Sequence, residues 1–143
     1  MLMGSANDRP KMAPAVETLA EFGVEAEEHV LSAHRAPAKV AAFARGARGA
    51  GFGAVICGAG MAAHLAGAVA ANTTLPVIGV PLSGSALNGV DALYATVQMP
   101  RGIPVATVAV DNAANAALLA VEILAVSDPS LAARLAEYRD GWA

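Results

Sequence analysis

The sequence predicts an α/β fold built around a parallel sheet. Short runs of Val, Ile and Leu alternate along the chain with segments whose apolar residues recur at helical spacing, which is the pattern of repeated strand–helix units. The segments that follow several of the apolar runs are rich in Gly, Ser or Pro, as expected where strands end at one edge of a sheet. The length of 143 residues fits a single domain, residues 1–143, that buries its core without disulfides or metal.

The first part of the chain contributes three expected strands and two expected helices. Residues 1–3 are apolar and start the first strand, residues 27–31 form the second, and residues 54–57 form a buried third. A helix over 9–22 is predicted by apolar residues at helical spacing: Met12, Val16, Leu19 and Ala20. Pro37, a favoured first-turn residue, opens the second helix. The apolar face of that helix is Val40, Phe43, Ala44 and Ala47.

The second part continues the alternation. Residues 61–71 form an Ala-rich helix, and residues 77–80 and 105–110 read as the fourth and fifth strands. Residues 112–126 form a helix that is apolar nearly all round, so other elements must cover it on several sides. A short last helix carries a stripe of three large side chains: Leu131, Leu135 and Tyr138.

Charged residues are distributed unevenly along the chain. The formal net charge is −3 and the pI is about 5.5, which argues against a nucleic-acid partner, because such surfaces cluster Lys and Arg. No Asp, Glu, Lys or Arg occurs between Arg48 and Asp91. A membrane span is not expected there, because Gly and Pro interrupt the stretch and its apolar residues are largely Ala. We therefore expect this stretch to form both core and the subunit interface of a homo-oligomer.

The Cys and His content limits the compartment and the cofactors. Cys57 is the only Cys and cannot form an internal disulfide, which fits a reducing compartment. Residues 1–5 do not read as a cationic signal sequence, so we expect a cytoplasmic protein. The three His are scattered and Cys57 has no partner at ligand spacing, so no metal site is expected. Gly58, Gly60 and Ala63 fit a dinucleotide fingerprint, but no acid follows about 20 residues later, so an NAD site is not expected.

Segments rich in Gly, Ser or Pro follow the first four strands and should meet at the carboxyl edge of the sheet, where open parallel sheets bind ligands. They read GSANDRP, SAHRAP, GAGMAAHLAG and PLSGSALNG. Ser5, Ser32 and Arg35 could surround one phosphate, with the guanidinium as a bidentate clamp, or could be capping and solvated residues. Asp8 could cap the following helix or accept hydrogen bonds from a ribose. His34 could be a simple turn residue or, as an imidazole with an ordinary pKa of about 6.5, could exchange a proton near neutral pH.

Several motifs occur in the order and spacing of one family. They are GS-x-x-D near the start, SAHR-x-P, GAG-x-AAHL-x-G, LPVIGVP, the stretch from Gly89 through VQMPRGIPVAT, and NAALLA. On these motifs the chain resembles the bacterial 5-(carboxyamino)imidazole ribonucleotide mutases of purine biosynthesis over essentially its whole length. The resemblance implies a three-layer, flavodoxin-like sandwich with a central parallel sheet, assembled as a homo-octamer. It also implies an isomerase that moves a carboxylate from the exocyclic nitrogen of an imidazole nucleotide to ring carbon 4 without ATP, metal or cofactor.

The resemblance also assigns roles to single residues. His34 matches the general acid and base of the family, and His64 joins it as the second catalytic position, where it shapes the pocket; taken alone, His64 could equally pack against a neighbouring subunit. The remaining assigned positions match the substrate pocket of the family: Ser5, Asp8, Ser32, Ala33, Arg35, Ala59, Gly60 and Leu65.

Alternatives and departures from the family pattern remain. Animal-type relatives carboxylate the aminoimidazole nucleotide directly with CO2 and are expected to carry SAHKGP, whereas Arg35 and AAHL here favour the mutase. A carboxylase acting on another heterocycle and a non-catalytic nucleotide-binding homologue are the further alternatives. Asn7, Met61 and Ala66 stand where the family usually has Ser, Gly and Pro. We expect Asn7 to retune the pocket, and Met61 and Ala66 to crowd or loosen the loop that would hold CO2. The first strand, expected in the middle of the sheet, has fewer apolar residues at its amino end than in relatives.

Overall fold

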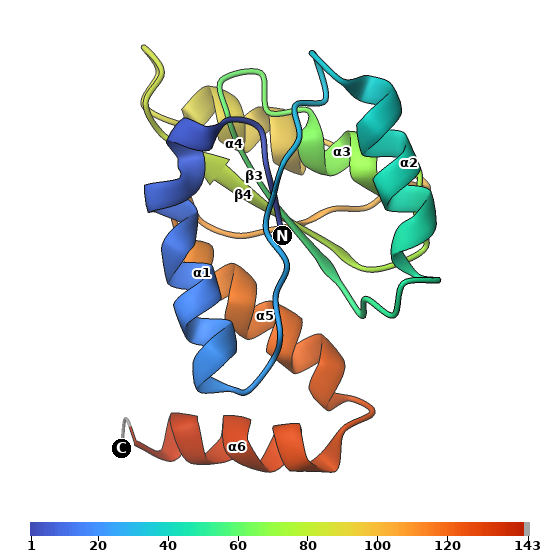
Figure 1. The fold of residues 1–143 in the computed structure, drawn as a ribbon. Helices are drawn as coiled ribbons and strands as arrows, with labels where there is room; N and C mark the ends of the chain where they lie inside the picture. Colours follow the sequence, from blue (N-terminus) through green and yellow to red (C-terminus); the bar gives the residue numbers. More distant parts are fainter. Residues whose placement is uncertain (142–143) are drawn as a thin grey trace.

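The computed structural model describes residues 1–141 and contains a sheet of five strands in the order β2-β1-β3-β4-β5 (Figure 1). All neighbouring strands pair in parallel. The strands are β1 (Leu2–Met3), β2 (His29–Val30), β3 (Val55–Gly60), β4 (Val77–Leu82) and β5 (Ala106–Thr107). This topology confirms the predicted parallel α/β fold and the interior position of the first strand.

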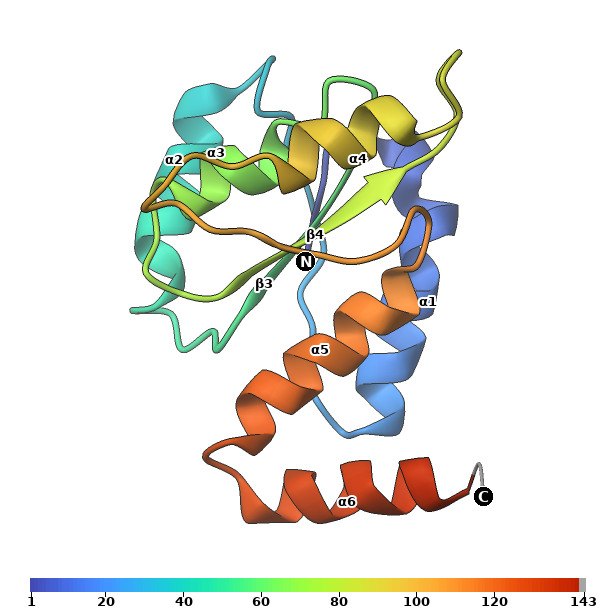
Figure 2. The same ribbon diagram turned by 180° about the vertical axis from the view of Figure 1, so that it is seen from behind.

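Helices cover both faces of the sheet and complete a three-layer sandwich (Figures 1 and 2). Helices α1 and α5 lie on one face and α2, α3 and α4 on the other, while α6 packs on α5. The helical segments are the 3-10 turn η1 (Ala6–Asp8), α1 (Arg9–Glu21), α2 (Pro37–Ala47), α3 (Leu65–Ala70), α4 (Val90–Val97), α5 (Ala113–Ala125) and α6 (Pro129–Asp140). The nearly all-apolar α5 is covered by α1, α6 and the sheet, as its sequence predicts. Within residues 1–141, no helix has the length and apolar character needed to cross a membrane.

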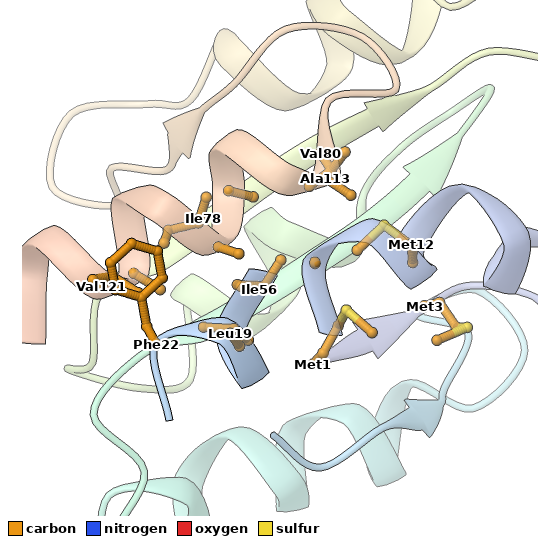
Figure 3. Close-up of a cluster of buried hydrophobic side chains, with 14 of the residues drawn as sticks. Met1, Met3, Met12, Leu19, Phe22, Ile56, Ile78, Val80, Ala113 and Val121 are labelled. Atoms are coloured by element: carbon orange, nitrogen blue, oxygen red, sulfur yellow. The ribbon is translucent and has the colours of Figure 1, made fainter. Parts of the chain in front are cut away.

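The core is divided by the sheet into two clusters. Successive strand residues point to opposite faces, so Met3 and Ile78 join the cluster under α1 and α5, whereas Leu2 and Val77 join the one under α2 and α3. Figure 3 shows the first cluster, in which the side chains of the sheet meet those of α1 and α5. Burial on both faces explains why the strands read as continuous apolar runs rather than alternating ones.

Two glycines within β3 and β4 set how closely helices approach the sheet. A Cβ at Gly58 would overlap the side chain of Met12, and a Cβ at Gly79 would overlap that of Thr96. Gly therefore allows the first turn of α1 to lie directly on β3, and α4 to lie directly on β4. The first close approach fixes the start of α1, which carries polar side chains of the site described below.

Helix α4 is absent from the elements expected from the sequence. Its buried face consists of Ala92 and Thr96, whereas the larger apolar side chains of this region are 48–62% exposed. Those side chains are Leu87, Val90, Tyr94 and Val97. The large apolar residues of this segment thus lie on the solvent-facing side of the helix. A prediction that assigns such residues to the core does not find the helix.

Several expected elements have different bounds in the structure. The strand expected over 27–31 is regular only at His29–Val30. Helix α3 begins at Leu65 rather than at residue 61, because Met61 has a φ of 54° and cannot belong to a right-handed helix. Strand β3 extends through Gly60, so the glycine segment lies in the strand. The strand expected over 105–110 is regular only at Ala106–Thr107, although the Val108 and Asp111 N–H groups still donate to carbonyls of β4.

Candidate active site

The connections after β1, β2, β3 and β4 gather at one edge of the sheet, at the top of Figure 1. They enclose a cleft of about 730 Å³. The cleft is lined by all ten residues assigned to the site from the sequence: Ser5, Asp8, Ser32, Ala33, His34, Arg35, Ala59, Gly60, His64 and Leu65. The structure therefore brings together side chains from four separate connections, as the carboxyl-edge argument predicts.

The first wall is the turn after β1. The Ser5 N–H donates to Asp8 Oδ2 at 2.9 Å, and Ser5 Oγ accepts from the Asn7 N–H at 3.2 Å. Asp8 occupies the N-cap position of α1, as the helix-cap alternative expects, but its carboxylate makes no capping bond to that helix. The carboxylate instead accepts from the Ser5 N–H and so closes the capping box of η1. Among residues 1–141, no donor reaches Asp8 Oδ1. Partial burial raises the pKa of this carboxyl, and the Ser5 N–H and the charge of Lys11 offset part of that rise.

A pair of histidines in contact with one another lines the cleft. His34 lies in the connection after β2, His64 lies directly before α3, and His34 Nε2 is 2.7 Å from His64 Nδ1. The rings are nearly perpendicular, at 84°, with centroids 4.9 Å apart. A bond between two ring nitrogens requires one hydrogen between them, so one ring donates and the other accepts. A proton gained by the pair is therefore carried on one of the two outer nitrogens, which suits proton exchange with a ligand.

Arg35 connects the segment after β2 to the turn after β1. Its guanidinium NH2 donates to the Gly4 carbonyl at 3.1 Å, and its backbone N–H donates to Ser32 Oγ at 3.3 Å. Ser32 thus fixes the turn that carries Arg35. Four of the five guanidinium N–H groups are left for solvent or an anion. Arg35 therefore stabilises the turn at Gly4 and is still available as a cation for a ligand.

Met61 and Ala66 occupy different environments. Met61 lines the cleft, is 65% exposed and adopts a left-handed backbone conformation that costs about 1–2 kcal/mol for a residue with a Cβ. Ala66 is buried under the sheet, close to Gly79. Met61, which replaces the usual Gly, therefore changes the lining of the cleft, whereas Ala66, which replaces the usual Pro, affects core packing.

Some lining residues were not singled out from the sequence, notably Lys11, Ser83 and Gly84. Lys11 follows Asp8 by three residues, which places both on one face of the turn that becomes α1. Ser83 directly follows β4 at the carboxyl edge. Both signals were present in the sequence. Over residues 1–141, no group of three or more His, Cys, Asp and Glu side chains is arranged to hold a metal ion.

The chain is similar to known proteins over nearly its whole length. The N5-carboxyaminoimidazole ribonucleotide mutases of Thermotoga maritima and Pyrococcus abyssi are 49% and 51% identical to the chain, over 98% of it and 82% and 80% of their own lengths. The phosphoribosylaminoimidazole carboxylase of Saccharomyces cerevisiae is 51% identical over 96% of the chain but only 24% of its own length. The crystal structure of Treponema denticola PurE superposes with a TM-score of 0.86 at 28% identity, covering 98% of this chain and 87% of that one. A family model described as AIR carboxylase matches residues 1–143, and the chain belongs to this family.

Proposed function

We propose that the protein is an N5-carboxyaminoimidazole ribonucleotide mutase, an isomerase of purine biosynthesis. It converts 5-carboxyaminoimidazole ribonucleotide into 4-carboxy-5-aminoimidazole ribonucleotide without ATP or a cofactor. The proposal is supported by curated mutases that are about half identical to the chain and are covered over most of their length. In the structure it is carried by one observation: the His34–His64 pair lies in a cleft whose walls hold polar groups suited to a nucleotide.

The reaction needs one group that first gives and later takes a proton. As the bond between the exocyclic nitrogen and the carboxylate carbon breaks, its electron pair stays on nitrogen, which takes a proton from His34. The released CO2 is then attacked by ring carbon 4, forming the new carbon–carbon bond. His34 finally removes the proton from that carbon, so the proton balance is restored. His64 holds the His34 ring through their shared hydrogen bond and completes the pocket.

The other lining residues divide between the two ends of the substrate. Ser5, Ser32 and Arg35 supply hydroxyl and guanidinium donors for the phosphate. The carboxylate of Asp8 has an oxygen free to accept hydrogen bonds from ribose hydroxyls. The remaining lining residues present backbone and small or apolar surface, which suits an imidazole ring and transient CO2: Ala33, Ala59, Gly60 and Leu65.

Assays with both imidazole nucleotides test the proposal. The purified protein should interconvert the carboxyamino and carboxy nucleotides without ATP, and added bicarbonate should change the rate little. The second candidate is direct carboxylation of aminoimidazole ribonucleotide, because the yeast relatives are phosphoribosylaminoimidazole carboxylases. Efficient carboxylation of the unmodified nucleotide at low CO2, without isomerisation, would establish that candidate instead. Binding without turnover of either nucleotide would identify a non-catalytic homologue.

We further propose that the chain assembles as a homo-octamer in the cytoplasm. Four apolar side chains form one stripe along α4 and the loop before it, and each is 48–62% exposed: Leu87, Val90, Tyr94 and Val97. The spacing of Val90, Tyr94 and Val97 by four and three residues places these three side chains on one side of α4. A contiguous exposed apolar face of this kind is typical of an interface between subunits. The single, buried thiol of Cys57 fits a reducing compartment.

Light scattering tests the assembly. The parent protein should have the mass of eight chains, and Tyr94→Asp should dissociate it because the new charge would be buried in the contact. Glu137→Gln on α6, a charge change far from the stripe in sequence and exposed in the structure, is the matched control and should remain octameric. A parent that stays monomeric at micromolar concentration would overturn this proposal.

A further inference from the structure

A second polar cluster joins three segments at one wall of the cleft. It consists of Lys11 on α1, Ser83 directly after β4 and Asp111 shortly before α5. Lys11 and Ser83 line the cleft, whereas Asp111 is not among the lining residues described. The cluster therefore links one wall of the cleft to Asp111, which does not line the cleft.

The ammonium group of Lys11 is fully engaged inside this cluster. It donates to the Ser83 carbonyl oxygen at 3.0 Å, to Asp111 Oδ2 at 3.2 Å, and also to Ser83 Oγ. An ammonium group has three hydrogens, so these three bonds use all of them. Lys11 thus lines the cleft with its donors turned into the protein, which identifies it as a support rather than as a ligand-binding cation.

Ser83 is held on every side. Its N–H donates to Asp111 Oδ1 at 2.9 Å, its hydroxyl donates to Asp111 Oδ2, and its carbonyl accepts from Lys11. Both backbone polar groups and the side chain of Ser83 are therefore fixed relative to α1 and to the turn before α5. Gly84, the next residue, also lines the cleft. The strand pair ending at Gly60 and Leu82 places this wall beside the glycine segment of β3.

Asp111 is held in a conformation that a residue with a Cβ rarely adopts. Its φ is 58°, and its N–H donates to the Pro81 carbonyl at 2.9 Å. Such strain persists only where surrounding contacts impose it, and it concentrates at functional sites. Burial acts to raise the pKa of this carboxyl, but the hydrogen bonds from Ser83 and Lys11 outweigh it and lower the pKa below its ordinary value. The carboxylate therefore stays ionised and keeps the cluster intact at neutral pH.

We infer that Lys11 and Asp111 are positioning residues that hold the Ser83–Gly84 wall of the cleft in place for the nucleotide. The inference rests on the proposed function, because the wall matters only if the cleft binds substrate. The cluster lies on segments other than those carrying His34 and His64. Its loss should therefore weaken binding in the ground state and the transition state alike, which raises KM and leaves kcat nearly unchanged.

The test uses four single variants and one double variant of the full chain. Lys11→Met keeps the length of the side chain but removes the donors, and we expect KM to rise about tenfold, with kcat within about twofold of the parent. Lys11→Arg keeps the charge and should recover part of the loss. Asp111→Asn suits the left-handed backbone but removes the charge, and should also raise KM. Lys39→Met, at an exposed position on α2 outside the cleft, is the matched control and should change neither constant.

The double variant Lys11→Met with Asp111→Asn separates a joint role from two independent ones. If the residues act through the same wall, its KM should rise by less than the product of the two single effects. An unchanged KM in Lys11→Met, whether or not its melting temperature falls, would overturn the inference, because a loss of folded protein lowers only the apparent kcat.

Calorimetric titration with 4-carboxy-5-aminoimidazole ribonucleotide keeps this test separate from that of the proposed function. A parent that binds this nucleotide without isomerising it would refute the mutase proposal, and the ratio of Kd values between parent and Lys11→Met would still decide the role of the cluster. A parent that does not bind the nucleotide would overturn the inference, since the wall would then position no substrate.

Discussion

Replacing His34 with Asn tests the assignment of proton transfer to one member of the histidine pair. Asn keeps a polar group of similar reach but cannot exchange a proton near neutral pH. General acid–base catalysis contributes about 10²–10⁴-fold to a rate, so kcat should fall at least about a hundredfold. The ring of His34 hydrogen-bonds to His64 and not to the side chains of Ser5, Asp8 or Arg35, so binding of the product nucleotide should be almost unchanged.

His64→Asn provides the comparison within the same pair. Its loss removes the 2.7 Å bond that orients the His34 ring. A neutral hydrogen bond contributes about 0.5–1.5 kcal/mol net, which corresponds to roughly 2- to 13-fold in rate. Both rings are exposed to solvent in the cleft, so the effect should lie in the lower part of that range. The two variants should therefore differ by at least about tenfold in kcat.

Single-turnover rates with saturating carboxyamino nucleotide measure the chemical step, and calorimetry with the product measures binding. Both variants should bind product within about threefold of the parent. A His34→Asn enzyme within tenfold of the parent, together with an inactive His64→Asn enzyme, would show that the roles of the two rings are reversed.

Three further predictions follow from single residues. Arg35→Ala should weaken nucleotide binding by roughly ten- to a hundredfold, since a charged hydrogen bond contributes about 1.5–3 kcal/mol, and Arg35→Lys should recover part of the lost affinity. If calorimetry finds an unchanged affinity for Arg35→Ala, the role of Arg35 is limited to its hydrogen bond with Gly4. Met61→Gly should raise the free energy of unfolding in urea by up to about 1 kcal/mol, because relief of the left-handed strain exceeds the entropic cost of Gly; a lower value would refute the strain. Burial raises the pKa of the Cys57 thiol to about 12, above the 9.0 of the exposed group. The thiol should therefore react with a disulfide reagent at pH 8 only after unfolding, and stability should decline as pH rises above about 9, where the unfolded chain loses the proton first; rapid labelling of the native protein would contradict this.

The sequence was sufficient for the sheet, most helices and the location of the cleft. Apolar runs buried on both faces read clearly as strands, and the carboxyl-edge rule then placed four connections together. Residues such as Ser5 and Arg35 could be assigned because they lie in motifs whose order and spacing resemble one family. The direct contact between His34 and His64 could not be predicted in the same way, because it depends on how two connections thirty residues apart are oriented.

Two further features could not be predicted from the sequence: the contact between Lys11 and Asp111, and helix α4. Lys11 and Asp111 are one hundred residues apart in the chain, and no local pattern links a helix lysine to an acid before another helix. Helix α4 was missed because its large apolar side chains face outward while Ala92 and Thr96 face inward. In both cases the information lies in tertiary packing, which hydrophobic periodicity alone does not encode.

During synthesis on the ribosome, the residues that line the cleft are made before the residues that hold them in place. Every lining residue lies between Gly4 and Gly84, so all of them have left the peptidyl-transferase centre well before the chain is finished. Yet Ser83 is fixed by Asp111, and α1, which carries Lys11, packs against α5. A nascent chain released after residue 84 would contain the full set of lining residues without the contacts that hold them. The carboxyl-terminal part of the chain thus stabilises the cleft only late in synthesis, and the nucleotide binding proposed above should arise only once that part has emerged and folded.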